Sequence, residues 1–210
     1  MRKGVAYDMG LWPLEVALLR RWRRRLWSGV RGPRVLELGS GTGLNFRYHP
    51  PGVSVTALDS DPDYLRHSAE RSRGDGGDAP SLVRGSAEAL PFPDSSFDDV
   101  VASFLLCSVE DRERVLEEAH RVLRSGGTLR LLEHCKPSGR MGDIFSRAAP
   151  WVSERFGDRI DNEPTPLLRA AGFEVRSVDT TAGRTLRLIV ADKVPAAESK
   201  GMDSPPEKPS

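Results

Sequence analysis

Three glycines and two acidic residues have the types and spacing of a nucleoside-binding site. Gly39, Gly41 and Gly43 directly follow a short apolar stretch, and Glu37 lies two residues before the first of them. Asp59 comes twenty residues after Gly39, at the end of a second apolar stretch. Glycines let a ligand approach the backbone closely, and a carboxylate at a strand end can accept both hydroxyls of a ribose. This pattern predicts a ligand with a nucleoside part.

The charge near the glycines indicates which nucleoside ligand fits. The dinucleotide pattern is G-x-G-x-x-G, but here the third glycine comes one residue early and Leu44 takes the dinucleotide position. A carboxylate as close as Glu37 would repel a pyrophosphate. The same carboxylate suits a ligand that carries an ammonium group and a sulfonium. The charges therefore favour S-adenosylmethionine over NAD.

The apolar pattern predicts an α/β fold that positions these residues. Strands alternate with helices of apolar period three to four, which is typical of a mostly parallel sheet with helices on both faces. The last two strands are separated by too few residues for a crossover helix, so they should form a hairpin with the final strand antiparallel. The predicted strands lie at 34–38, 53–58, 82–83, 97–104, 128–132, 173–178 and 185–191. A helix should follow the glycines and stop early at the prolines at 50–51, and further helices are predicted to open at 61–62 and to span 112–123 and 165–171.

The N-terminal segment is basic and amphipathic. Residues 1–34 carry nine Lys/Arg and two acidic residues, a net charge of +7, while the rest of the chain carries −6. One interpretation is a helix packed on the domain with a solvated arginine face. The alternatives are a helix that sits on an anionic membrane surface or contacts a lipid-like substrate, and a helix that contacts a nucleic acid. We expect a basic helix or lid at 1–30, one catalytic domain at 31–193 and a disordered tail at 194–210.

Composition excludes several classes of protein. The 210 residues are 38% hydrophobic and 29% charged, with a net charge of +1, which gives no general case for nucleic-acid binding. Two cysteines are too few for a disulfide scaffold, and the four histidines form no cluster, so we expect no metal. Neither a signal peptide nor a membrane span is evident. We expect a cytoplasmic protein, with peripheral membrane contact as an option.

Several motifs together resemble the class I S-adenosylmethionine-dependent methyltransferases over about residues 30–192. They are the glycine motif at 37–43 (ELGSGTG), then Asp59, and then residues 85–92 (GSAEALPF), 96–98 (SFD) and 121–127 (RVLRSGG). The resemblance implies a seven-stranded Rossmann-like sheet with a reversed last strand. It also implies S-adenosylmethionine as methyl donor, S-adenosylhomocysteine as product and a small-molecule acceptor.

The resemblance also implies which residues contact the cofactor. Many relatives carry an aspartate at position 86 for the adenine amino group, where this chain has Ser86. Tyr7 resembles the lid tyrosine of some relatives, with a plain aromatic anchor as the alternative. The implied contacts are Tyr7, Glu37, Gly39, Ser40, Gly41, Gly43, Asn45, Asp59, Ser60, Ser86, Ala87, Glu88, Ser103 and Phe104.

The acceptor end of the site has only weak catalytic candidates. Cys107, Glu133 and His134 follow the fourth and fifth strands, and each has a structural role as its alternative. Residues 105–109 and the Glu133-His134 pair resemble a branch with thiol, lipid and quinone methyltransferases. The sequence of residues 156–162 differs from that of the branch in the region that normally shapes the acceptor pocket. The resemblance therefore does not identify the methyl acceptor. The competing functions are a nucleic-acid methyltransferase and a non-catalytic adenosine-binding subunit.

Overall fold

The computed structural model describes residues 19–73, 78–134, 164–181 and 186–194. Tyr7, most of the tail at 194–210 and the segment at 135–163 lie outside the described residues. The expected domain boundaries remain predictions.

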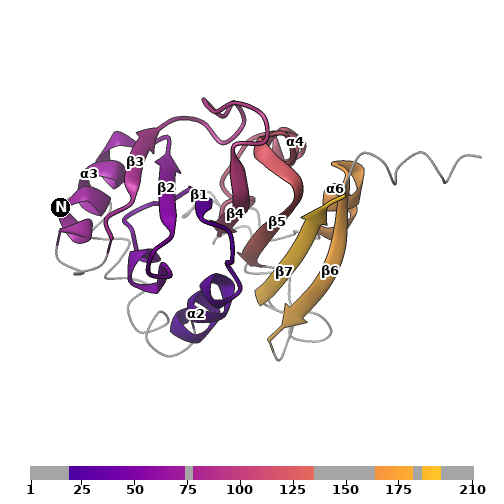
Figure 1. Cartoon of the computed structure of the whole chain (residues 1–210), viewed down its shortest axis with the longest axis horizontal. Coiled ribbons are helices and arrows are strands. Elements are labelled where there is room, and N and C mark those ends of the chain that lie inside the picture. Colours follow the sequence, from indigo (N-terminus) through magenta and orange to yellow (C-terminus); the bar gives the residue numbers. More distant parts are fainter. Residues whose placement is uncertain (1–18, 74–77, 135–163, 182–185, 195–210) are drawn as a thin grey trace, which may run out of the picture.

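Seven strands form one sheet in the order β3-β2-β1-β4-β5-β7-β6 (Figure 1). Neighbouring pairs among the first five strands are parallel, whereas β7 runs antiparallel to both β5 and β6. The predicted reversed last strand is therefore confirmed. The strands are β1 (Arg34–Leu38), β2 (Ser54–Asp59), β3 (Ser81–Arg84), β4 (Phe97–Ser103), β5 (Leu123–His134), β6 (Phe173–Thr180) and β7 (Leu186–Lys193).

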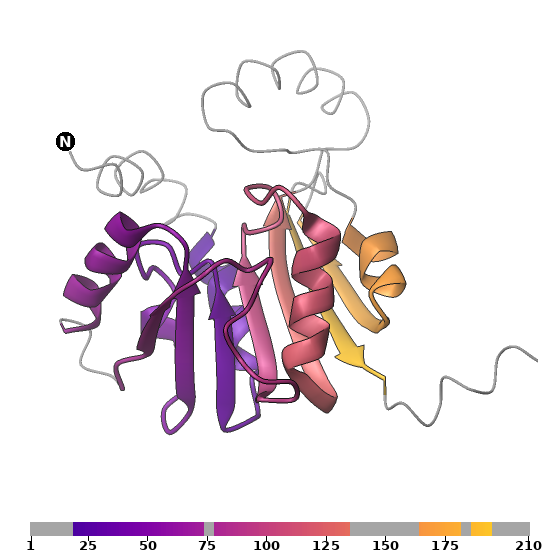
Figure 2. The same cartoon turned by 90° about the horizontal axis from the view of Figure 1, so that it is seen from above.

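Helices cover both faces of the sheet. Alternate side chains of a strand point to opposite faces, and both faces of this sheet are apolar, so each packs against helices. On β1, Leu36 and Leu38 belong to the cluster that includes α4 and α6, whereas Val35 packs with α2. Figure 2 shows α4 and α6 on the near side of the sheet. The described helices are α2 (Arg20–Ser28), α3 (Pro62–Ser72), α4 (Arg112–Val122), α6 (Pro164–Ala170) and the 3₁₀ turn η2 (Phe46–Tyr48).

Two elements differ from the sequence prediction. The helix expected after the glycines is only the single turn η2, because two prolines at 50–51 end any helical continuation. The fifth strand is longer than predicted. It begins at Leu123 and follows α4 directly, with Gly126 in the left-handed region at φ +69°.

The parallel strands bring the predicted site together. The carboxyl ends of parallel strands meet at one edge of a sheet, and ligands of open α/β sheets bind there. At this edge β1 ends before the glycines, β2 ends at Asp59, and β4 ends at Ser103. The order of the sheet places β1 between β2 and β4, so all three strand ends are neighbours.

Candidate functional site

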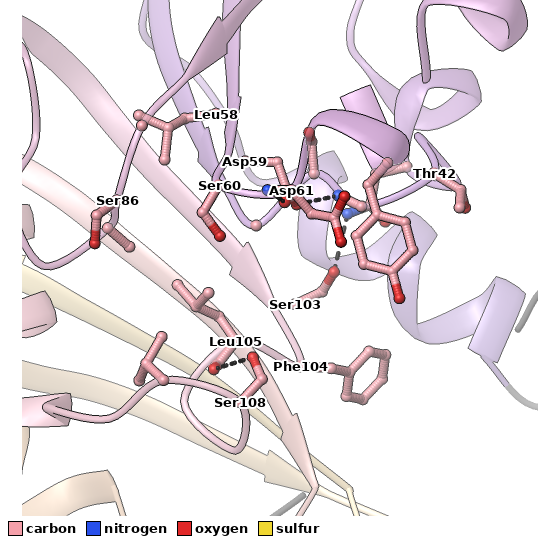
Figure 3. Close-up of a pocket in the computed structure, with 18 of the residues that line it drawn as sticks. Thr42, Leu58, Asp59, Ser60, Asp61, Ser86, Ser103, Phe104, Leu105 and Ser108 are labelled. Atoms are coloured by element: carbon pink, nitrogen blue, oxygen red, sulfur yellow. Dashed lines mark hydrogen bonds between the residues drawn. The ribbon is translucent and has the colours of Figure 1, made fainter. Parts of the chain in front are cut away.

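A cavity of about 840 Å³ opens at the carboxyl ends of β1, β2 and β4 (Figure 3). Most of the predicted cofactor residues line it. Glu37 and Gly43 do not, and Tyr7 lies outside the described residues. The predicted contacts that line the cavity are Gly39, Ser40, Gly41, Asn45, Asp59, Ser60, Ser86, Ala87, Glu88, Ser103 and Phe104.

The glycine turn needs backbone conformations that other residues avoid. Gly39, Gly41 and Gly43 have φ values of +66°, +54° and +80°. A Cβ added to Gly41 would meet no protein atom within 4 Å, and Gly41 lines the cavity, so its missing side chain leaves room for a ligand. A Cβ at Gly43 would lie 2.7 Å from the ring of Phe46. The third glycine therefore leaves the space in which the ring of Phe46 packs against the turn.

Asp59 organises the turn as well as the cavity wall. Its Oδ2 accepts a hydrogen bond from the N–H of Gly41 at 2.8 Å, and its Oδ1 accepts one from the N–H of Asp61 at 2.9 Å. Burial raises the pKa of Asp59 above its usual value, and these two hydrogen bonds partly offset the rise. A carboxylate oxygen can accept more than one hydrogen bond. Both carboxylate oxygens of Asp59 can therefore accept a further hydrogen bond from a hydroxyl group of a ligand.

Glu37 lies behind the cavity wall. Its Oε1 accepts a hydrogen bond from Asn45 Nδ2 at 2.7 Å, and its Oε2 lies 3.1 Å from His49 Nε2. The side chain is 1% exposed. Asn45 lines the cavity and Glu37 does not, so Glu37 holds in place the side chain of a residue in the cavity wall.

Several residues that line the cavity were not among the predicted contacts, and Arg23 is the one that comes from α2. One interpretation of the sequence placed the arginines of this helix on a solvated face, but Arg23 is 5% exposed and lines the cavity. Its Nη1 donates hydrogen bonds to Asn45 Oδ1 at 2.7 Å and to Ser103 Oγ at 3.2 Å. A signal was available in the sequence: Leu19, Arg23 and Leu26 are spaced four and three apart, which puts Arg23 on the buried stripe of α2.

Phe104 and His134 form the end of the cavity beyond Ser103. Phe104 has φ +56°, an uncommon value outside glycine that marks functional sites in many proteins. Its ring stacks on His134 with 4.3 Å between centroids, and the Arg23 guanidinium carbon lies 5.4 Å from its centroid. Burial, together with the charge of Arg23, lowers the pKa of His134 to about 4. The imidazole is therefore neutral at pH 7 and a weak base.

The other two catalytic candidates do not line the cavity. Glu133 is fully buried, and its Oε1 accepts hydrogen bonds from the N–H groups of Leu105 and Leu106 at 3.1 and 3.0 Å. Cys107 is buried, and its thiol donates to the carbonyl of Phe104 at 3.2 Å. These contacts hold the turn after β4, which favours the structural alternative for both residues.

The opposite wall comes from the segment after β3. Ser86, Ala87 and Glu88 line the cavity there, and Figure 3 shows Ser86 on one side of Asp59 with Ser103 and Phe104 on the other. The hydroxyl of Ser86 accepts a hydrogen bond from the N–H of Glu88 at 3.1 Å.

These residues fit S-adenosylmethionine by their donors and charges. The carboxylate of Asp59 suits the ribose diol, and the cation of Arg23, bonded to Ser103 on the side away from Ser86, suits a carboxylate. Ser40 Oγ is buried in the wall, and no residue that the structure describes forms a hydrogen bond with it, as expected of a group that meets a ligand. No cluster of three metal-ligating side chains occurs in the described parts of the chain.

The model of one protein family, described as a methyltransferase domain, matches residues 36–131. This range runs from β1 into β5. It includes the glycine turn, Asp59, the segment after β3 and the end of β4.

Two curated proteins and one solved structure illustrate the similarity. A thiol S-methyltransferase of Rattus norvegicus is 36% identical over 147 residues, 65% of this chain and 60% of the relative. A phosphatidylethanolamine N-methyltransferase of Cereibacter sphaeroides is 34% identical over 152 residues, 68% of this chain and 75% of the relative. A SAM-dependent methyltransferase of Aquifex aeolicus superposes with a TM-score of 0.63 at 19% identity, covering 86% of this chain and 92% of that one.

Proposed function

This chain belongs to the class I S-adenosylmethionine-dependent methyltransferases, and we propose that its methyl acceptor is a small hydrophobic thiol. The cofactor supplies a methyl group on a sulfonium, which an acceptor lone pair displaces in line. The protein must align the acceptor and exclude water. A base is needed only where the acceptor keeps its proton at neutral pH.

The proposal of a thiol acceptor rests on the weak basicity of His134. It is the one of our three catalytic candidates that lines the cavity, and with a pKa of about 4 it is too weak a base to help an alcohol or an ammonium group lose a proton. A thiol has an ordinary pKa of about 8.5 and forms enough thiolate without help. The thiol S-methyltransferase among the relatives supports this proposal, although this chain spans only 60% of its length.

A matched set of acceptors tests the thiol proposal. We expect an aryl or alkyl thiol to be methylated at least ten times faster, as kcat/KM, than the alcohol and the amine of the same skeleton. The pH profile should rise to the pKa of the acceptor thiol and should shift when a thiol of different pKa is used. His134→Gln should leave that profile unchanged between pH 6 and 9, because His134 is already neutral there.

Formation of S-adenosylhomocysteine is the measurement for every acceptor in the set. Equal or faster turnover of the amine or the alcohol would contradict the thiol proposal. Phosphatidylethanolamine and bulk RNA belong in the same assay, because their methylation would point to the lipid or the nucleic-acid alternative.

We further propose how the cavity holds the cofactor. Asp59 binds the ribose hydroxyls and the segment from Ser86 to Glu88 contacts the adenine. Arg23 pairs with the carboxylate of the methionine part, supported by its burial and by its hydrogen bond to Ser103 in the cavity wall. Ser40 supplies a hydroxyl beside the methionine part, supported by the lack of a partner for its Oγ among the described residues.

The outer face of α2 supports a contact with an anionic membrane surface. Arg20, Arg21 and Arg24 are exposed on it, while Arg25 pairs with Asp179 at 2.8 Å. Among the described helices, none is long and apolar enough to cross a bilayer. We propose that this face brings the protein to membranes that hold a hydrophobic acceptor.

Vesicle binding tests the membrane contact. The protein should bind phosphatidylglycerol vesicles at low salt. Replacing Arg20, Arg21 and Arg24 with glutamine should weaken binding by roughly 100-fold, since each basic residue near an anionic surface contributes ~1 kcal/mol. Glutamine at Arg66, Arg73 and Arg169, which are exposed on other parts of the chain, is the control for net charge. Equal binding to phosphatidylcholine vesicles at high salt would contradict the proposal.

A further inference from the structure

The wall proposed to contact adenine has little regular structure of its own. Residues 85–96 connect β3 to β4, with one isolated bridge between Ser86 and Ala89. A segment outside the sheet ladder needs partners elsewhere for its backbone groups. The contacts with α4 therefore decide where Ser86, Ala87 and Glu88 lie in the cavity.

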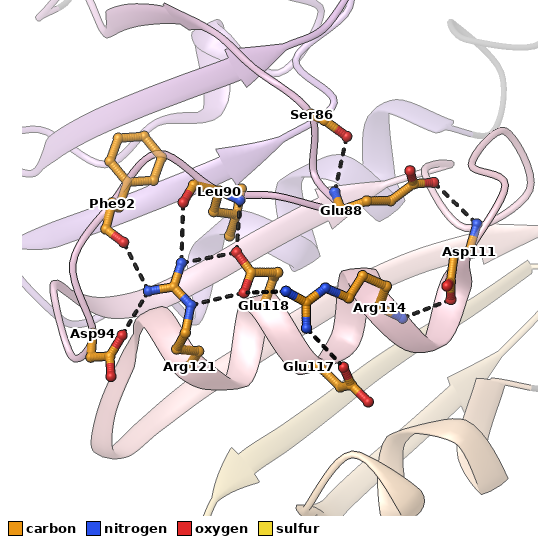
Figure 4. Close-up of polar contacts among 10 residues, drawn as sticks. All are labelled: Ser86, Glu88, Leu90, Phe92, Asp94, Asp111, Arg114, Glu117, Glu118 and Arg121. Carbon is orange, nitrogen blue, oxygen red and sulfur yellow. Dashed lines mark hydrogen bonds and ion pairs between the residues drawn. The ribbon is translucent and has the colours of Figure 1, made fainter.

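An ion pair on α4 binds this segment at Leu90. Glu118 Oε2 accepts a hydrogen bond from the N–H of Leu90 at 2.7 Å, and Arg121 Nη2 donates to the carbonyl of the same residue at 3.1 Å (Figure 4). Both backbone groups of Leu90, two residues beyond Glu88, are thus held by one pair of side chains. Leu90 is itself buried, so these groups have little water to replace the lost partners.

Arg121 extends the contact along the segment. Its Nη1 donates to the carbonyl of Phe92 at 2.9 Å and to the carboxylate of Asp94 at 2.7 Å. Its Nε and Nη2 bind the two carboxylate oxygens of Glu118 at 2.8 and 2.9 Å. A planar guanidinium can hold this many partners in fixed directions, which an ammonium cannot.

Glu118 is built to remain ionised while buried. The residue is 4% exposed, and the hydrogen bonds from Arg121 lower the pKa of its carboxyl to about 2. A second link joins the same wall to the start of α4, where Glu88 Oε1 accepts hydrogen bonds from the N–H groups of Glu110 and Asp111 at 3.0 and 3.1 Å. The wall is held on both sides of Ala89.

We propose that Glu118 and Arg121 are positioning residues that set the adenine wall and thereby determine how well the enzyme distinguishes adenine from other bases. The proposal rests on the adenine contact proposed above. Neither residue lines the cavity, so both act through Leu90, Phe92 and Asp94. The shape of the wall, and with it the hydrogen bonds offered to the base, depends on this pair.

Base discrimination is the measurement that separates positioning from mere stability. S-adenosylhomocysteine and S-inosylhomocysteine, which carries hypoxanthine in place of adenine, are titrated at a temperature where every protein is folded. In Arg121→Lys we expect the Kd for S-adenosylhomocysteine to rise five- to twentyfold, since the ammonium cannot replace the five hydrogen bonds of the guanidinium. The Kd for S-inosylhomocysteine should change less. The ratio of the Kd for S-inosylhomocysteine to the Kd for S-adenosylhomocysteine should therefore fall at least threefold. The kcat at saturating S-adenosylmethionine should stay within twofold.

Two further variants make the result decisive. Glu118→Gln keeps the shape and an acceptor for the N–H of Leu90 but removes the charge that holds Arg121, so it should also lower the ratio. Arg114→Lys is the matched control, because Arg114 pairs with Glu117 and Glu118 on the same helix (Figure 4). Among the described residues, its side chain forms no hydrogen bond or ion pair with the segment at 85–96. It should leave the ratio unchanged.

The outcomes separate this proposal from the cofactor assignment. A ratio unchanged in both Arg121→Lys and Glu118→Gln would overturn the positioning role while the cofactor assignment stands. A wild-type protein that does not bind S-adenosylhomocysteine would overturn the cofactor assignment and this proposal with it.

Discussion

Replacement of Asp59 by alanine should weaken the binding of S-adenosylmethionine by about 1–3 kcal/mol, or roughly 5- to 150-fold, because ribose hydroxyls then lose their buried acceptor. The same loss is expected for 5′-methylthioadenosine, which has the ribose and the adenine but lacks the amino-acid part. Isothermal titration calorimetry with both ligands measures the two effects.

Asp59 also accepts hydrogen bonds from the N–H groups of Gly41 and Asp61, so two further variants are needed. Asp59→Asn keeps the size of the side chain and one acceptor oxygen, and its affinity should lie between those of the wild type and the alanine variant. Asp63→Asn is the control, since Asp63 is exposed in the first turn of α3 and does not line the cavity. Wild-type affinity in Asp59→Ala would contradict the ribose contact.

Replacement of Arg23 by alanine should weaken the binding of S-adenosylmethionine by a similar amount. The binding of 5′-methylthioadenosine should be almost unaffected. A hydrogen bond between charged groups contributes about 1.5–3 kcal/mol, which corresponds to roughly 10- to 150-fold. The methylthio compound has no carboxylate to lose. Titration of both ligands therefore distinguishes the Arg23 contact from that of Asp59.

The neighbouring Arg24 provides the control for Arg23. It lies on the same helix but is exposed, so Arg24→Ala should bind both ligands like the wild type. Arg23→Lys keeps the charge and should recover part of the affinity. A loss of affinity for 5′-methylthioadenosine equal to that for S-adenosylmethionine would show that Arg23 only holds Asn45 and Ser103 in place.

Much of the fold could be predicted because its signals are local. Asp61 and Pro62 predicted the start of α3, and Asp61 indeed accepts a hydrogen bond from the N–H of Asp63 as the helix cap. The short connection before the last strand predicted the hairpin of β6 and β7. The prolines at 50–51 predicted an early end to the helix after the glycines, and the single turn η2 is all that forms there.

The sequence alone determined the family and the order of strands and helices along the chain, because glycine turns, strand ends and helix caps depend on residues close together in the chain. It also predicted cofactor contacts, most of which line the cavity. Tertiary structure alone decided that Glu37 lies behind Asn45 and that Arg23 enters the cavity. It also decided that His134 stays neutral. These properties depend on burial and on neighbours from distant elements. Arg23 of α2 meets Ser103 across 80 residues of sequence. Burial, together with the charge of Arg23, lowers the pKa of His134 at the end of β5.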